Sequence, residues 1–370
     1  MWIKGVVSAL AIMAAAGAQA QQNSRQTYSE RDFATVPKFD AHVHANDDSP
    51  AFLEIARKDG FELLSINVDY PDFPPIDTQA RLAEKFHKAD PAHFHYATTF
   101  SMKGFGTPGW SGRVLQTLDA AFAKGAIAVK VWKNIGMVEN DANGKRVFLD
   151  DPRFDPVMAH IRQAHVPLIA HQGEPRNCWL PLDQMTTDND RSYFKAHPNY
   201  YMYLHPEEPS YEMIMAARDR FVAFHPRLPF VGAHLASLEW NVDRVAEFLD
   251  RFPNATVDMA ARMSELQHQS NQDYERVRAF LIKYQDRLLY GTDLTASPPG
   301  PDALAQNPPM TDDFVQEADS VWRSDWRYLA TPNSQHIAAL DAEVKGLALP
   351  RTVIDKIYYK NARRVFLKGA

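Results

Sequence analysis

The chain has 370 residues, of which 45% are hydrophobic and 11% aromatic, so it is long enough to bury one large core or two modest ones. Its formal net charge is -6 at pH 7 and its 40 lysines and arginines are scattered, which makes nucleic acid an unexpected partner. The single cysteine, Cys178, excludes a disulfide within the chain and is expected to be structural or part of a lid.

The N-terminus has the features of a secretory signal. Lys4 precedes an apolar run over residues 5–16, and a small-x-small cleavage pattern ends at Ala20. An uncleaved membrane anchor is the alternative, but the run is shorter than the roughly 20 residues that a spanning helix needs. We therefore expect cleavage after Ala20, a linker over residues 21–36, and an exported protein, periplasmic or secreted, without membrane contact after cleavage.

Apolar segments of β type then alternate with segments of helical type. Strands are expected at residues 38–44, 61–68, 93–101, 126–134, 166–172, 229–237, 255–263 and 288–295. Helices are expected at residues 49–60, 111–125, 151–165, 209–226, 237–252 and 271–285. Repeated βα units in one chain of this length predict a closed (β/α)8 TIM barrel, an α/β fold, as a single domain over residues 37–370. No glycine-rich phosphate motif follows any expected strand, which argues against dinucleotide and P-loop folds.

Two connections are too long for simple barrel turns. Residues 174–208 follow the fifth expected strand and are rich in tyrosine. Residues 296–336 follow the eighth, begin with several prolines, and then carry Trp322 and Trp326. Both leave from the C-terminal face of a barrel, where active sites lie, so both are candidate lids.

Metal-competent side chains stand at the ends of four expected strands. His42 and His44, in FDAHVHAND, project to the same side because strand side chains alternate. His171, His234 and Asp293 end the fifth, sixth and eighth strands. An HxH pair alone is weak grounds for a metal site, but five such residues at one end of a barrel are not a coincidence. Imidazoles and a carboxylate can hold a divalent ion that activates water.

These residues resemble the amidohydrolase superfamily. The stretches KVWKNIG, AHQGEP, VGAHLAS, FLDRFPNATVDMAAR, IKYQDRLLYGTD and KIYYKNARRVF are similar to its branch of metal-dependent hydrolases known as amidohydrolase family 2, over residues 39–367. The resemblance implies one divalent ion, with zinc as the first choice, and the ligands His42, His44, His171 and Asp293. It also implies that His234 orients water or a substrate oxygen and that Asp293 accepts the proton.

The fourth expected strand, in AIAVKVWKN, places Lys130 and Lys133 on opposite faces. Some amidohydrolases carry a carboxylated lysine there that bridges two metals, and such a lysine needs a lowered pKa. The alternative is an ordinary lysine that pairs with a carboxylate such as Glu174 or contacts the substrate. We favour this alternative and a single ion, because the branch is commonly mononuclear, and we expect Glu174 to support the ligands from outside the ligand set.

Three further residues are candidates for substrate binding. Arg176 and Arg262 could each hold a substrate carboxylate through a two-pronged contact, and a structural ion pair is an equal alternative for each. Trp132 could form an aromatic wall with the tyrosines of residues 174–208, although packing within a lid explains these aromatic residues equally well.

Three functions are consistent with these features. The first is metal-dependent hydrolysis of a small cyclic ester, amide or related C–O or C–N bond, with Asp293 as proton shuttle. The second is non-oxidative decarboxylation of a small aromatic or unsaturated carboxylic acid on the same metal. The third is a non-catalytic barrel that binds metal or ligand. We favour the first, with a small-molecule substrate, and a homo-oligomer is compatible with it.

Overall fold

The alternating apolar segments form one parallel sheet in chain order. The structure is a computed structural model that describes residues 27–297 and 312–367. Within this part of the chain the sheet has the order β8-β7-β6-β5-β4-β3-β2-β1-β9. Its strands are β1 (Lys38–Ala45), β2 (Phe61–Ile66), β3 (Phe94–Thr98), β4 (Ala128–Val131), β5 (Leu168–Ala170), β6 (Phe230–Gly232), β7 (Ala255–Asp258), β8 (Leu288–Leu289) and β9 (Leu294–Ala296). The sheet closes on itself because β8 pairs with β7 while β9, the next strand along the chain, pairs with β1. The predicted TIM barrel is confirmed.

The eighth predicted strand, residues 288–295, is broken in the structure. Residues 290–293 leave the ladder between β8 and β9, and Asp293 has a positive φ of 70°. At this break the Ala41 N–H donates to the Tyr290 carbonyl at 3.0 Å, and the Asp293 N–H donates to the His42 carbonyl at 2.8 Å. The break therefore ties Asp293 directly to the middle of β1.

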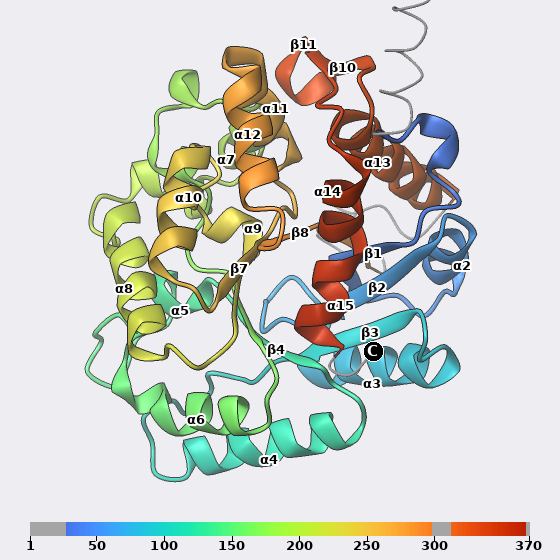
Figure 1. Ribbon diagram of the computed structural model, residues 1–370. Helices are drawn as coiled ribbons and strands as arrows, with labels where there is room; N and C mark the ends of the chain where they lie inside the picture. The colour runs from blue at the N-terminus through green and yellow to red at the C-terminus, as the bar shows by residue number, and fades with distance from the viewer. Residues whose placement is uncertain (1–26, 298–311, 368–370) are drawn as a thin grey trace, which may run out of the picture.

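Helices surround the sheet on the outside (Figure 1). They are α2 (Ala51–Lys58), α3 (Ile76–Ala89), α4 (Trp110–Ala123), α5 (Asn134–Met137), α6 (Asp155–Gln163), α7 (Asp188–Ala196), α8 (Tyr211–Phe224), α9 (Ala233–Ala236), α10 (Val242–Arg251), α11 (Met263–Gln272), α12 (Tyr274–Lys283), α13 (Asp312–Ala330), α14 (Arg351–Asp355) and α15 (Asn361–Phe366). Helix α10 begins five residues later than predicted, because residues 234–237 form a left-handed turn. The predicted helices did not include α3, α5, α7, α9, α11, α13, α14 and α15.

The barrel interior is filled by side chains from almost every strand. Phe39, Leu64, Ile169, Val231 and Leu289 belong to this inner cluster and are completely or almost completely buried. Helix α15 contributes to the same cluster: the ring of Phe366 stacks on that of Phe39, near the start of β1, with centroids 6.4 Å apart. This cluster does not fill the opposite end of the barrel, where the strands end, and the site lies there.

Two expected segments pack differently from the prediction. Residues 27–36, expected as part of a linker, include Phe33, which is 1% exposed and contacts Trp326. Trp322 and Trp326, expected in a lid, lie on α13 and are buried in the core, where the Trp322 Nε1–H donates to Asp40 at 2.9 Å.

A few expectations lie outside the described residues. They concern the signal segment 1–20, the first part of the linker, and the proline-rich start of the second long connection. Export therefore stays a prediction. Among residues 27–297 and 312–367, no helix combines the length and apolar character needed to cross a membrane. A two-stranded antiparallel hairpin, β10 (Ser334–Ile337) and β11 (Ala342–Lys345), completes the fold.

Candidate active site

The five predicted metal-competent residues line one cavity of about 130 Å³. They come from β1, from the residues just after β5 and β6, and from the break between β8 and β9. The backbone at two of these ends is unusual, since His234 and Asp293 both have positive φ. The lining consists of His42, His44, Val68, Tyr70, Phe73, Lys130, Trp132, Lys133, His171, His234, Asp293 and Thr295.

Three acceptor atoms meet in this cavity. Asp293 Oδ1 lies 3.1 Å from His44 Nε2 and 3.4 Å from His42 Nε2. The other nitrogen of each ring faces an acceptor: His44 Nδ1 lies 2.7 Å from the Ile66 carbonyl, and His42 Nδ1 lies 3.0 Å from Asp258 Oδ2. Each Nδ1 therefore carries the proton and each Nε2 presents a lone pair. Lone pairs on three atoms repel one another unless a cation or a proton lies between them.

Two more imidazoles complete the constellation. The ring of His234 lies 4.2 Å from that of His171 and 4.8 Å from that of His42, measured between centroids. His234 Nδ1 donates to the Ala260 carbonyl at 2.8 Å, which leaves its Nε2 for the cavity. His171 Nε2 is buried without any hydrogen-bond partner. A divalent ion would satisfy this orphaned nitrogen together with the converging acceptors, so the residues present fit a metal.

Burial keeps these groups in the protonation states that metal binding requires. It lowers the pKa of His234 to about 3, and it lowers the pKa of His42 and that of His171, so all three rings are neutral at pH 7. Burial alone would raise the pKa of Asp293, but at the low pH where this carboxyl titrates the positive charge of protonated His234 and His42 holds its pKa well below its usual range. Asp293 is therefore a carboxylate.

Asp258, at the end of β7, is a site residue that the sequence analysis missed. One of its oxygens accepts the His42 Nδ1–H, and the other accepts the His234 N–H at 2.8 Å and the Ala260 N–H at 3.2 Å. Burial raises its pKa, but His42 and His234 bring the pKa below its usual value. Asp258 therefore orients two of the histidines. A lone carboxylate at the end of the apolar strand ATVD was the signal in the sequence.

The two lysines lie on the same side, contrary to the prediction of opposite faces. Strand β4 ends at Val131, so strand alternation no longer applies at Lys133, and both lysines line the cavity. Lys130 Nζ lies 3.3 Å from His42 Nε2, and burial lowers the pKa of this lysine to about 8. Lys133 forms an ion pair with Glu174. This pair is the alternative that was favoured for these lysines, an ordinary lysine paired with Glu174, although Lys133 rather than Lys130 forms it.

A second cavity of about 370 Å³ adjoins the first, since both are lined by Tyr70, Trp132 and Lys133. The rings of Tyr70 and Trp132 are 4.4 Å apart. Tyr193 and Tyr200, from the long connection after β5, form another part of its wall. Trp132 therefore stands where the inner cavity opens into an aromatic vestibule.

The two candidate arginines lie elsewhere. Arg176 stacks over the Trp240 ring at 4.2 Å in a separate pocket between α8 and α10. Arg262 is mostly buried, with its Nη1 3.6 Å from Asp190 Oδ1, and it lines neither cavity. The structural ion pair, the alternative raised for Arg262, is what the structure contains.

Cys178 lies in the buried interior of the long connection after β5. It packs with Met185, Phe194 and Tyr201, and its thiol donates to the Tyr200 carbonyl at 3.1 Å. Burial raises the pKa of this thiol well above its ordinary value, so it is not a nucleophile. This agrees with the structural role expected for Cys178.

Two buried glutamates, Glu265 and Glu239, lie near Arg262, and their raised pKa values predict a dependence of stability on pH. Burial raises the pKa of Glu265 to about 8 and that of Glu239 to about 7, and the neighbouring carboxylates add to the shift of Glu265. The folded protein holds the Glu265 proton above pH 4.5, the ordinary pKa at which the unfolded side chain releases it. Stability should therefore fall as the pH rises through this window towards 8.

A Glu265→Gln protein should unfold at a higher temperature than the parent above about pH 8, and the difference should vanish near pH 5. Thermal unfolding followed by circular dichroism across this range measures it. Glu275→Gln, on the exposed side of α12, is the control and should show no such pH-dependent difference. Equal differences at both ends of the range would contradict the prediction.

Comparisons with known proteins agree with this arrangement. The family model described as amidohydrolase matches residues 39–367. A 2,6-dihydroxybenzoate decarboxylase from Rhizobium is 16% identical, with 90% of this chain and 98% of that chain covered and a TM-score of 0.51. A 2,6-dihydroxybenzoate decarboxylase in complex with 2,6-dihydroxybenzoate is also 16% identical, with 90% and 99% covered and a TM-score of 0.50. At these identities the two structures show a common fold. None of the curated proteins compared with the chain matches it.

Proposed function

Because the chain belongs to the amidohydrolase family, whose members are metal-dependent enzymes, we propose that it hydrolyses a small cyclic ester, amide or related C–O or C–N bond. The observation that carries the proposal is the meeting of His42 Nε2, His44 Nε2 and Asp293 Oδ1 beside the orphaned His171 Nε2. We propose these four residues as the ligands of one ion, with zinc as the first choice. The enzyme family argues against the non-catalytic alternative.

The chain's own groups have separable tasks. A bound divalent ion would supply Lewis-acid activation of water and polarisation of a carbonyl oxygen. Asp293, ionised and partly open to the cavity, takes a proton from the attacking water and passes it to the leaving group. His234 is neutral and directs its Nε2 towards the cavity, where it orients water or a substrate oxygen. Tyr70 and Trp132 narrow the entrance and limit the access of bulk water.

Decarboxylation is the weaker candidate. An arginine was expected to hold the carboxylate that leaves, but Arg176 and Arg262 do not line the inner cavity. In the vestibule Arg146 is already paired with Glu208. The cations of the inner cavity are lysines: Lys133 is paired with Glu174 and Lys130 lies against His42, so the two-pronged arginine contact expected for decarboxylation is not formed by its lining residues.

The test starts with protein from residue 21 onward, purified without chelators, and its metal content is measured by plasma mass spectrometry. Uncharged aromatic and aliphatic lactones, esters and cyclic amides, together with small aromatic and unsaturated carboxylic acids, are then screened in ¹⁸O-labelled water. One transition-metal equivalent and one ¹⁸O atom in the acid product are expected. Release of carbon dioxide without ¹⁸O in the product would establish decarboxylation instead, and a second metal equivalent would point to carboxylated Lys130.

A further inference from the structure

His234 stands at the start of a left-handed turn that contains no glycine. Residues 234–237 have φ values of 57°, 56°, 56° and 56°. For L-residues this conformation brings Cβ close to the following carbonyl and is normally adopted by single residues only. A consecutive run of this kind persists only where its surroundings hold it.

The turn folds back over the end of β6. A Cβ placed on Gly232 would lie 2.6 Å from Ala236 Cβ, so only glycine leaves room for the turn. The turn also brings the His234 N–H to Asp258 and the His234 ring to the Ala260 carbonyl. The direction of the His234 ring therefore depends on the conformation of this turn.

Each carbonyl of the turn has a partner. The Ser237 N–H donates to the His234 carbonyl at 3.0 Å, and the Leu238 N–H donates to the Leu235 carbonyl at 3.1 Å. The remaining two carbonyls receive side chains from α8. The Arg218 Nη1–H donates to Ala236, and the Tyr211 hydroxyl donates to Ser237.

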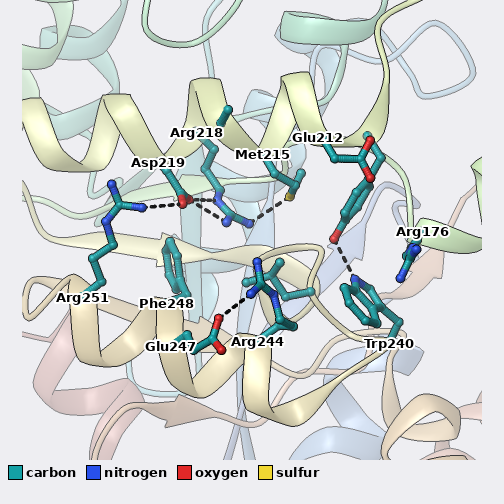
Figure 2. A pocket seen from close by; sticks show the side chains of 13 residues that line it. Arg176, Glu212, Met215, Arg218, Asp219, Trp240, Arg244, Glu247, Phe248 and Arg251 are labelled. Carbon is teal, nitrogen blue, oxygen red and sulfur yellow. Dashed lines mark hydrogen bonds and ion pairs between the residues drawn. The ribbon is translucent and has the colours of Figure 1, made fainter.

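The two α8 side chains are themselves held in place, and Figure 2 shows Arg218 with its partner Asp219. Arg218 is 2% exposed, and its Nε and Nη2 donate to Asp219 Oδ1 at 3.0 and 2.7 Å. Its guanidinium also lies over the Phe248 ring, 4.5 Å from the centroid. The Tyr211 hydroxyl accepts the Trp240 Nε1–H at 3.0 Å, which directs its own proton towards Ser237.

We propose that Arg218 and Tyr211 are positioning residues for His234: by holding the Ala236 and Ser237 carbonyls they maintain the left-handed turn and with it the direction of the imidazole. The proposal rests on the proposed role of His234 in the site. The turn alone cannot satisfy these carbonyls, because its internal hydrogen bonds use only those of His234 and Leu235. Loss of either α8 group would leave a carbonyl unpaired beside the turn.

Two variants test the proposal, Arg218→Lys and Tyr211→Phe, by hydrogen exchange and mass spectrometry of peptides that contain residues 233–240. We expect the Ser237 and Leu238 amides to exchange about tenfold faster in each variant, while peptides of β1 to β4 keep the parent rate. In ¹⁵N-histidine-labelled protein, the Nδ1–H signal that is lost in His234→Gln should shift in both variants. These readouts need no turnover, so they are independent of whether hydrolysis is found.

The chain offers matched controls. Arg287 donates to the Phe252 carbonyl at 2.6 Å, and the Tyr274 hydroxyl donates to the Gly346 carbonyl at 3.0 Å, both away from the turn. Arg287→Lys and Tyr274→Phe should leave the exchange of residues 233–240 and the His234 signal unchanged. Parent-like exchange in both α8 variants, or equally faster exchange throughout the barrel, would overturn the proposal.

Chemical rescue gives a further test. Arg218 lines a cavity of about 540 Å³ between α8 and α10, so a small cation can reach its position. In Arg218→Ala, guanidinium ion at millimolar concentration should restore the slow exchange of the turn, whereas sodium ion at the same concentration should not. Faster exchange that guanidinium fails to reverse would count against the positioning role. If this variant does not fold, Tyr211→Phe decides the question.

Discussion

The Asp293→Asn protein should lose activity by about 10²- to 10⁴-fold in kcat, the usual contribution of a positioned proton acceptor. Asparagine keeps an oxygen next to His42 and His44 but cannot take a proton at neutral pH. It also tolerates the positive φ of 70° at this position, so the fold should persist. Steady-state kinetics on a substrate found in the ¹⁸O screen measure the loss, with metal content determined on the same sample.

The control for this substitution is Asp341→Asn. Asp341 is exposed on the hairpin of β10 and β11 and also has a positive φ, of 46°. The substitution therefore also places asparagine at a position with positive φ, but outside the site. It should keep the parent kcat. Full activity in Asp293→Asn with bound metal would exclude Asp293 as the proton shuttle, whereas activity that returns fully when lost metal is reloaded would assign it as a ligand only.

The Asp258→Asn protein should bind its metal about 10 to 100 times more weakly, the usual effect of removing a carboxylate behind a ligating histidine. The His234 and Ala260 N–H groups would hold the amide oxygen, leaving the amide NH₂ against His42 Nδ1. His42 would then carry its proton on Nε2 and lose the lone pair that faces Asp293. Competition with a chromogenic chelator gives the dissociation constant directly.

Asp325→Asn is the matched control for the Asp258→Asn substitution. Asp325 is also a buried carboxylate, and it accepts the Tyr290 hydroxyl at 2.9 Å without contacting any of the histidines. Its substitution can reduce stability but should leave metal affinity at the parent value. An unchanged dissociation constant in Asp258→Asn would show that the His42 tautomer does not depend on Asp258.

The metal-competent residues could be grouped from the sequence because their positions depend on local regularities. In a parallel barrel the strand ends lie on one face, so His42, His44, His171, His234 and Asp293 could be grouped from their places at the ends of apolar segments, whereas their division into ligands and a non-ligand came from the family resemblance. The barrel itself followed from the alternation of strands and helices. These inferences need only the periodicity of strand and helix and the order of the segments.

Other parts of the site depend on contacts between residues far apart in the chain. The side of the barrel on which Lys133 lies was mispredicted because the end of β4 could not be located to the residue, and one position decides the direction of a side chain. The pairing of Asp258 with His42 joins residues 216 positions apart, which no local pattern contains. Likewise, Trp322 was predicted to lie in a lid but lies in the core, because α13 packs beside β1 and β2.

The sequence by itself determined the barrel, the histidines and the carboxylate that can hold a metal, because residue type, strand periodicity and chain order are local properties. The orientation of these side chains is determined only by the tertiary structure. The break between β8 and β9 directs Asp293, Asp258 selects the His42 tautomer, and the left-handed turn held by α8 directs His234. The first two depend on hydrogen bonds to β1 whose partners become neighbours only when the barrel closes. The third depends on contacts between α8 and the turn, between residues 18 and 26 positions apart in the chain.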